Sequence, residues 1–176
     1  MKQKSFYLLF CIPLICASCA LKPLTLQRVD NTSGLFKLNG LYYGDSDVFY
    51  KRRVFIFYEN GVLFITGCLK EQDLNYWKKA YLNLNNYQKI PYWWGVYQVD
   101  NNGNIELEKW YSTDYEYPTV RFRGKVVNDT TLLIAYPSVD KLKSTTYFND
   151  FSASVVDTFQ FVPLSPKPDS TNNFIK

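Results

Sequence analysis

The stretch RRVFIFYENGVLFITG at residues 52–67 decides the fold class of this chain of 176 residues. Two runs rich in β-branched and aromatic residues flank Asn60-Gly61, and these residue types are enriched in strands. Asn-Gly is the preferred pair for a two-residue hairpin turn. The stretch therefore predicts two antiparallel strands joined by a tight turn.

Two further hairpins follow the same design. WWGVYQVDNNGNIELEKWY, residues 93–111, has a strand-like run on each side of a polar turn at residues 100–104. TVRFRGKVVNDTTLLIAY, residues 119–136, repeats the pattern with Asn128-Asp129 in its turn. The alternation of apolar and polar residues is typical of strands with one buried and one wet face. Two more strands, KLNGLYYGD and VVDTFQFVPL, are expected at residues 37–45 and 155–164.

The whole series amounts to about eight short strands, most of them joined by hairpins. It predicts an all-β fold, an antiparallel up-and-down barrel over residues 35–164, because closure removes the exposed edges of apolar strands. One segment departs from this rhythm. Residues 71–89 carry Leu74, Trp77, Tyr81 and Leu84 at helical spacing and predict one short helix in mid-chain.

The chain begins with the pattern of an exported protein. Lys2 and Lys4 precede an apolar run at residues 6–17, which is shorter than the roughly 20 apolar residues of a membrane span. Small residues then lead to Cys19, so residues 1–18 are expected to be a signal peptide. The Ser18-Cys19 pair resembles the signal of bacterial lipoproteins, which implies acyl chains on Cys19 and a membrane anchor. An ordinary cleaved signal with an incidental cysteine is the alternative.

The ends of the mature chain are polar. Residues 19–34 are expected to be the lipidated cysteine and a tether, and residues 165–176, SPKPDSTNNFIK, a flexible tail. Ala20-Leu21-Lys22 lacks the aspartate that retains many lipoproteins in the inner membrane. We therefore expect a bacterial cell-envelope location, on the outer membrane and facing the periplasm.

Composition excludes several kinds of chemistry. Without residues 1–18 the chain has 18 basic and 16 acidic residues, so its near-neutral charge gives no support for a nucleic-acid partner. There is no histidine, which excludes a histidine general base and histidine metal ligands. Cys68 is the one cysteine beyond Cys19, so a thiolate metal site is excluded, and a buried inert thiol is expected there. No cofactor is predicted.

The segments NGLYYGD, WGVYQVDNNGNIELEKWY and FRGKVVNDTTLLI, with the aromatic hairpin between the first two, carry a resemblance. Over roughly residues 35–162 the chain resembles the small lipocalin-like lipoproteins of Gram-negative bacteria. The resemblance implies a calycin-type barrel open at one end. Tyr42 stands where the larger lipocalin family has tryptophan, and residues 130–176 lack that family's arginine on the last strands.

Aromatic residues with polar tips are the candidate ligand contacts, since such side chains suit the wet mouths of pockets. A plug in the barrel bottom or core is the alternative for the Trp93-Trp94 pair. Glu106 and Glu108 are candidates for a hydrolytic carboxylate pair, but their alternation with apolar residues predicts a solvent face. The candidate ligand-binding residues are Tyr42, Trp94, Tyr97, Trp110 and Tyr115.

These patterns lead to one hypothesis of function with two alternatives. We expect a membrane-anchored lipoprotein whose barrel binds a small apolar or amphipathic ligand and which is not an enzyme. The first alternative is a structural or assembly accessory of the cell envelope that binds a protein or glycan partner. The second is a carboxylate-dependent hydrolase.

Overall fold

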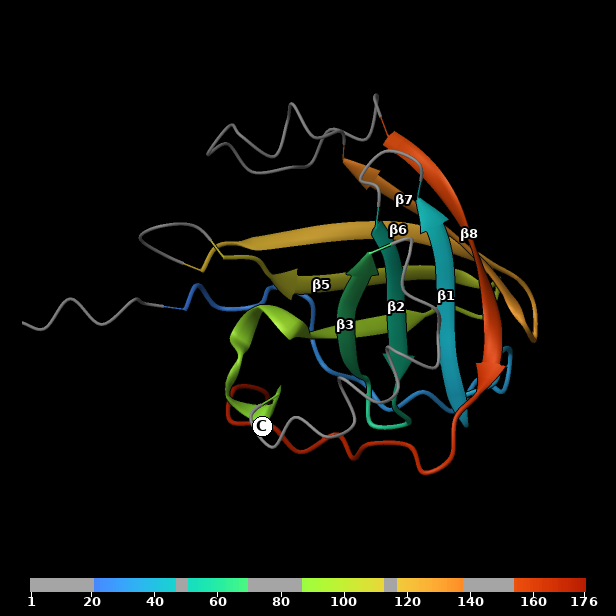
Figure 1. Cartoon of the computed structure of the whole chain (residues 1–176). Helices are drawn as coiled ribbons and strands as arrows, with labels where there is room; N and C mark the ends of the chain where they lie inside the picture. Colours follow the sequence, from blue (N-terminus) through green and yellow to red (C-terminus); the bar gives the residue numbers. More distant parts are fainter. Residues whose placement is uncertain (1–20, 47–50, 70–86, 113–116, 138–153) are drawn as a thin grey trace, which may run out of the picture.

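The chain folds into one closed barrel of eight antiparallel strands (Figure 1). The computed structural model describes residues 21–46, 51–69, 87–112, 117–137 and 154–176. Each strand pairs with its neighbours in sequence, and the last pairs with the first, so the predicted all-β up-and-down barrel is confirmed. The strands are β1 (Gly40–Ser46), β2 (Lys51–Phe57), β3 (Val62–Leu69), β4 (Trp94–Val99), β5 (Asn104–Trp110), β6 (Thr119–Asn128), β7 (Thr131–Pro137) and β8 (Ser154–Pro163).

Little helix is present in the described ranges. Two short 3₁₀ turns, η2 (Tyr87–Lys89) and η3 (Pro91–Trp93), precede β4. The helix predicted for residues 71–89 falls mostly on residues 70–86, which lie outside the described residues. Its last three residues are the 3₁₀ turn η2 and not part of an α-helix.

The β2–β3 hairpin forms as predicted, but its turn is longer by one residue. Tyr58 N–H donates to the Val62 carbonyl at 3.0 Å, so the loop consists of three residues. Gly61 has φ 73°, as expected for a three-residue loop that ends on a left-handed residue. The β carbon of any other residue would also lie about 2.3 Å from the Val29 carbonyl oxygen, so both the backbone and the space require glycine.

Alternation along the strands divides the core into two clusters. Tyr42 points into the barrel and is buried, while its neighbour Tyr43 packs on the outside, as the sequence predicts. Phe55 and Phe57 of β2 point inward, whereas the residues between them point outward. The buried residues of the interior are Phe36, Tyr42, Phe55, Phe57, Leu63, Ile65, Tyr97, Ile105, Leu107, Val120, Phe122, Leu132, Ile134, Tyr136 and Phe159.

One end of the barrel is filled by an aromatic plug. The ring of Phe36 lies 5.2 Å from that of Phe57, 5.8 Å from that of Tyr42 and 6.1 Å from that of Tyr97, each centre to centre. The β2–β3, β4–β5 and β6–β7 turns lie at this plugged end. The antiparallel topology places the other four connections, including β5–β6, at the opposite end, which we call the loop end.

The second cluster lies on the outside of the wall and is covered by both chain ends. Residues 21–34 run along the wall, and the residues after β8 fold back beneath the barrel (Figure 1). The ring centres of Phe174 and Trp110 lie 6.1 Å apart. The segments expected to be a tether and a flexible tail thus pack on the barrel where they are described. Apolar residues within them account for this packing: Leu26 is buried, and Leu24, Phe174 and Ile175 pack against the cluster.

Candidate ligand site in the barrel

Two of the candidate ligand residues, Tyr42 and Tyr97, belong to the filled part of the barrel. The Tyr42 hydroxyl donates to the Asp129 carbonyl at 3.0 Å, and the Tyr97 hydroxyl donates to the Tyr58 carbonyl at 2.7 Å. Burial is the main reason why the pKa of each phenol is raised. Both hydroxyl groups are therefore engaged with backbone at the plugged end.

The two candidate tryptophans lie on the other side of the wall. Trp94 is fully buried, but it packs in the outer cluster, where its indole N–H donates to the Tyr87 carbonyl at 3.0 Å. Trp110 also faces outward, and its indole N–H donates to the Lys22 carbonyl at 2.6 Å. Of the alternatives for the Trp93-Trp94 pair, a place in the core is confirmed for Trp94, which is buried in the outer cluster. Trp94 does not plug the barrel, because the register of β4 turns Tyr97 inward.

The remaining sequence candidates lie outside the described part of the chain. Tyr115 falls within residues 113–116, and Cys19 precedes the first described residue. Cys68 is the last residue but one of β3, but its side chain is not described, so the expected buried thiol stays a prediction.

Charged residues inside the barrel were not among the sequence candidates. Arg53 lies on the inward face of β2, two residues before Phe55, and its guanidinium carbon is 3.9 Å from the centre of the Tyr136 ring. Lys109 shares the inward face of β5 with Leu107. Asp157 is buried on the inward face of β8, two residues before Phe159. All three lie toward the loop end of their strands.

The electrostatics of this group centre on Lys109. Lys109 is half-buried on this face and keeps part of its surface accessible. Burial of the ammonium, together with the positive charge of Arg53, lowers the pKa of Lys109 to about 7. No hydrogen bond or ion pair joins this ammonium to any described residue. Partial loss of hydration disfavours the charged form of Lys109, and an anion beside it would favour that form.

The Tyr136 phenol completes the surroundings of the two cations. Its ring lies under the guanidinium of Arg53, and its burial raises the pKa of the phenol. The phenol therefore stays neutral and does not compensate the positive charges of Arg53 and Lys109.

No protein-family model, characterised protein or solved structure matches the chain.

The sequence did contain a signal for these residues. In RRVFIFY, Arg53 falls on the same two-residue period as Phe55 and Phe57, and in NIELEKW, Lys109 falls in phase with Ile105 and Leu107. A charge on the apolar face of a strand is unusual, because burying it costs free energy. A charged residue on the two-residue period of the apolar face predicts this part of the interior, whereas the clusters of aromatic residues do not.

Glu108 corrects the expectation of a solvent face on β5. This residue is 2% exposed, because the N-terminal segment covers it. Its carboxylate accepts hydrogen bonds from the backbone N–H groups of Thr25, at 2.8 Å, and of Leu26. Glu106, which is partly exposed, accepts from Arg123 Nε at 2.9 Å. Both carboxylates thus hold structural partners on the outer wall.

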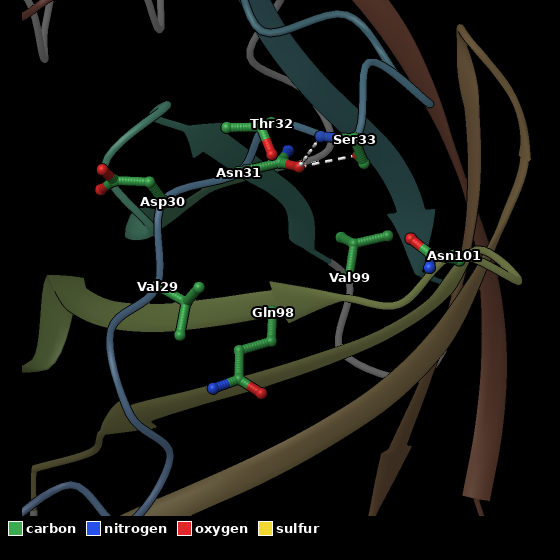
Figure 2. Close-up of a pocket in the computed structure, with 8 residues that line it drawn as sticks. All are labelled: Val29, Asp30, Asn31, Thr32, Ser33, Gln98, Val99 and Asn101. Carbon is green, nitrogen blue, oxygen red and sulfur yellow. Dashed lines mark hydrogen bonds between the residues drawn. The ribbon is translucent and has the colours of Figure 1, made fainter.

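Three pockets lined by described residues lie at the surface. One of about 280 Å³ lies between residues 29–33 and β4 (Figure 2). There Asn31 Oδ1 accepts from both the N–H and the hydroxyl of Ser33, so these polar groups satisfy each other. The others measure about 420 Å³, beside Tyr58 and Lys167, and about 480 Å³, between the two chain ends.

Neither a metal centre nor a spanning helix is found in the described ranges. No group of three or more metal-ligating side chains comes together there. None of the helices in these ranges is long and apolar enough to cross a bilayer.

Proposed function

We propose that this chain is a lipid-anchored protein of the bacterial cell envelope whose lipocalin-like barrel binds a small amphipathic anion at its loop end. The observation that carries the proposal is the pair of cationic side chains, Arg53 and Lys109, directed into the barrel. The anchor follows from the signal-like N-terminus and Ser18-Cys19, and the location in the envelope follows from the anchor.

The charge of the ligand follows from Lys109. The ammonium is destabilised by partial loss of hydration and by the charge of Arg53, and a bound carboxylate, phosphate or sulfate would offset both effects. Arg53 adds a second positive charge, and its cation–π contact with Tyr136 holds the guanidinium in place. Asp157 contributes one opposing charge among these inward-facing residues.

The size and the amphipathic character of the ligand follow from the barrel. An eight-stranded barrel is just wide enough for side chains or for one small ligand. The plugged end is occupied by Phe36, Tyr42, Phe57 and Tyr97, so a ligand would enter the barrel at the loop end. The wall next to the charges is apolar. On the side toward the plug, Phe55 is the inward-facing neighbour of Arg53 on β2, and Leu107 is that of Lys109 on β5. An apolar group attached to the anion would contact this wall.

Binding is preferred to catalysis on chemical grounds. The sequence supplies no histidine, and Glu106 and Glu108 hold partners on the outside of the wall, away from Lys109. A hydrolase would need a carboxylate pair facing a common substrate. Lys109 and Arg53 therefore bind the charged group of the ligand and take no part in a reaction.

Native mass spectrometry of the full chain, released from detergent micelles, tests this proposal. We expect one dodecanoate per chain and at least about tenfold weaker binding of dodecanol, which has the same alkyl length without the charge. Lys109→Gln and Arg53→Gln should each weaken dodecanoate binding by about tenfold or more. Lys125→Gln, at an exposed site on β6, is the matched control and should bind dodecanoate like the wild type.

Two results would overturn the anion site. Equal binding of dodecanol and dodecanoate would refute recognition of the charge. Absence of binding by either compound would refute a small-amphiphile site and favour the envelope accessory that binds a protein or glycan partner.

A further inference from the structure

We infer that the β5–β6 corner of the barrel's loop end faces the membrane to which the chain is anchored. This inference rests on the lipid anchor of the proposed function and is independent of the anion site. The partner surface is a phospholipid bilayer. Three features of the chain place it there: the position of Leu21, its distance in sequence from Cys19, and the path of residues 21–34.

The first described residue lies at the loop end. Leu21 forms a parallel bridge with Tyr117, and Lys22 N–H donates to the Tyr117 carbonyl at 3.2 Å. Tyr117 stands two residues before the start of β6 at Thr119, which pairs with Trp110 at the end of β5. The chain therefore reaches the barrel at the corner where β5 ends and β6 begins.

The distance from this corner to the anchor is short. Cys19 precedes Leu21 by two residues, and an extended residue spans at most about 3.6 Å. An acylated Cys19 would thus lie within about 7 Å of the corner. Its acyl chains enter the bilayer, so the corner lies close to the lipid headgroups.

Residues 22–31 are hydrogen-bonded to the barrel wall at several points, so they cannot act as a flexible linker. Trp110 binds the Lys22 carbonyl near the loop end. Glu108, two residues nearer the plugged end on β5, binds the Thr25 N–H. Near the plugged end, Gln98 Nε2 donates to the Gln27 carbonyl at 2.9 Å. Asn31 N–H then donates to the Glu59 carbonyl, in the β2–β3 turn, at 2.6 Å. The path runs from the loop end to the plugged end, so the plug points away from the membrane.

This orientation gives the proposed ligand a source. The end of the barrel that carries Arg53 and Lys109 faces the leaflet, where amphipathic anions are concentrated. For a ligand of the proposed anion site, the leaflet is then a nearer source than the surrounding solution.

Fluorescence quenching on vesicles tests the orientation. A fluorophore is attached to the full, lipidated chain at Ser112→Cys or at Asn102→Cys, both in a Cys68→Ser background. Ser112 is exposed just after β5, and Asn102 is exposed in the turn before β5, so the two sites lie at opposite ends of one strand. Phosphatidylcholine vesicles carry a nitroxide on the headgroup, which quenches only nearby dye. We expect at least threefold stronger quenching at position 112 than at position 102.

Two controls separate the orientation from the anchor. Flotation with vesicles, compared with Cys19→Ser, reports the anchor alone, and equal flotation of the two would refute both the anchor and this inference. A chain that floats but is quenched equally at both positions, or more at position 102, overturns the orientation and leaves the anchor intact. Insertion of six Gly/Ser residues between Cys19 and Leu21 should keep flotation and reduce quenching at position 112.

Discussion

Arg53 and Lys109 carry positive charges into the same barrel interior, and the charge of Arg53 adds to burial in lowering the pKa of Lys109 to about 7. Burial is the larger of the two causes. A protein that only needed a stable core would place an apolar residue at position 109, since burying an ammonium costs free energy. The pair therefore makes the protein less stable than the fold permits. Such a loss of stability is common where residues are kept for function.

Replacing Lys109 with methionine should stabilise the protein at pH 7, by about 1–3 kcal/mol. The pKa of Lys109 is about 7 in the folded chain and 10.5 for an unperturbed lysine, so above pH 7 the unfolded chain binds the extra proton. The free energy of unfolding of the wild type should then rise with pH between about 7 and 10.5. The advantage of Lys109→Met should shrink over the same range. Urea unfolding at pH 7, 8, 9 and 10 measures it.

The comparison with Lys109→Met isolates this residue. Arg53, Tyr136 and Asp157 face the same interior and are present in both proteins, so their titration largely cancels in the difference. A stability difference that is independent of pH from 7 to 10 would contradict the burial of the ammonium.

Glu108→Ala should lower the free energy of unfolding by about 2–3 kcal/mol. The change removes the acceptor for the N–H groups of Thr25 and Leu26, which then lose their partner beneath the N-terminal segment. Urea unfolding measures the loss, and hydrogen exchange at residues 21–28 should become faster. Glu106→Ala is the matched control on the same strand face, and it should cost less than about 1 kcal/mol because its pair with Arg123 is partly exposed. Equal costs for the two changes would contradict the role of Glu108 in holding the segment.

Phe36→Ala should cost about 3–4 kcal/mol, because it empties the centre of the aromatic plug. Phe36 is 4% exposed and touches Tyr42, Phe57 and Tyr97 edge to face. Phe36→Leu retains most of the volume and should cost less than half as much. Thermal or urea unfolding measures both, and a cost below about 1 kcal/mol for alanine would show that the plug does not support the barrel.

The barrel could be predicted because its signals are local. A two-residue period between turn residues identifies each strand, and a series of strands joined mostly by hairpins leaves few topologies. The length of the β2–β3 turn could not be predicted from Asn60-Gly61, because the same pair also suits a three-residue loop that ends on a left-handed glycine. The close approach of Val29 to Gly61 depends on a contact between segments distant in sequence.

The site was harder to predict than the fold for a related reason. Trp94 and Trp110 are as apolar as interior residues. Their place in the outer cluster depends on what covers them, which is Tyr87 before β4 for Trp94 and the two chain ends for Trp110. Glu108 has the phase of a solvent-facing residue, and its burial comes from Thr25 and Leu26, which lie 83 and 82 positions away. Two-residue alternation assigns a side chain to a face, but it does not say what covers that face.

Cys19→Ser should release the protein from membranes. Two or three acyl chains anchor a protein stably, whereas a chain without them would depend on weak surface contacts. Fractionation of cells that express the wild type or the variant measures this, with alkaline carbonate extraction to remove loosely attached protein. The anchor is refuted if the variant pellets with membranes to the same extent as the wild type.

The most direct test of the central claim is native mass spectrometry of the full chain extracted from its own membranes. We predict a chain that begins at Cys19 and carries acyl groups, with one additional anionic amphiphile that is lost on denaturation and is absent from Lys109→Met. An acylated chain that carries no such molecule in either protein would contradict ligand binding in the barrel. A chain without acyl groups would contradict the anchor.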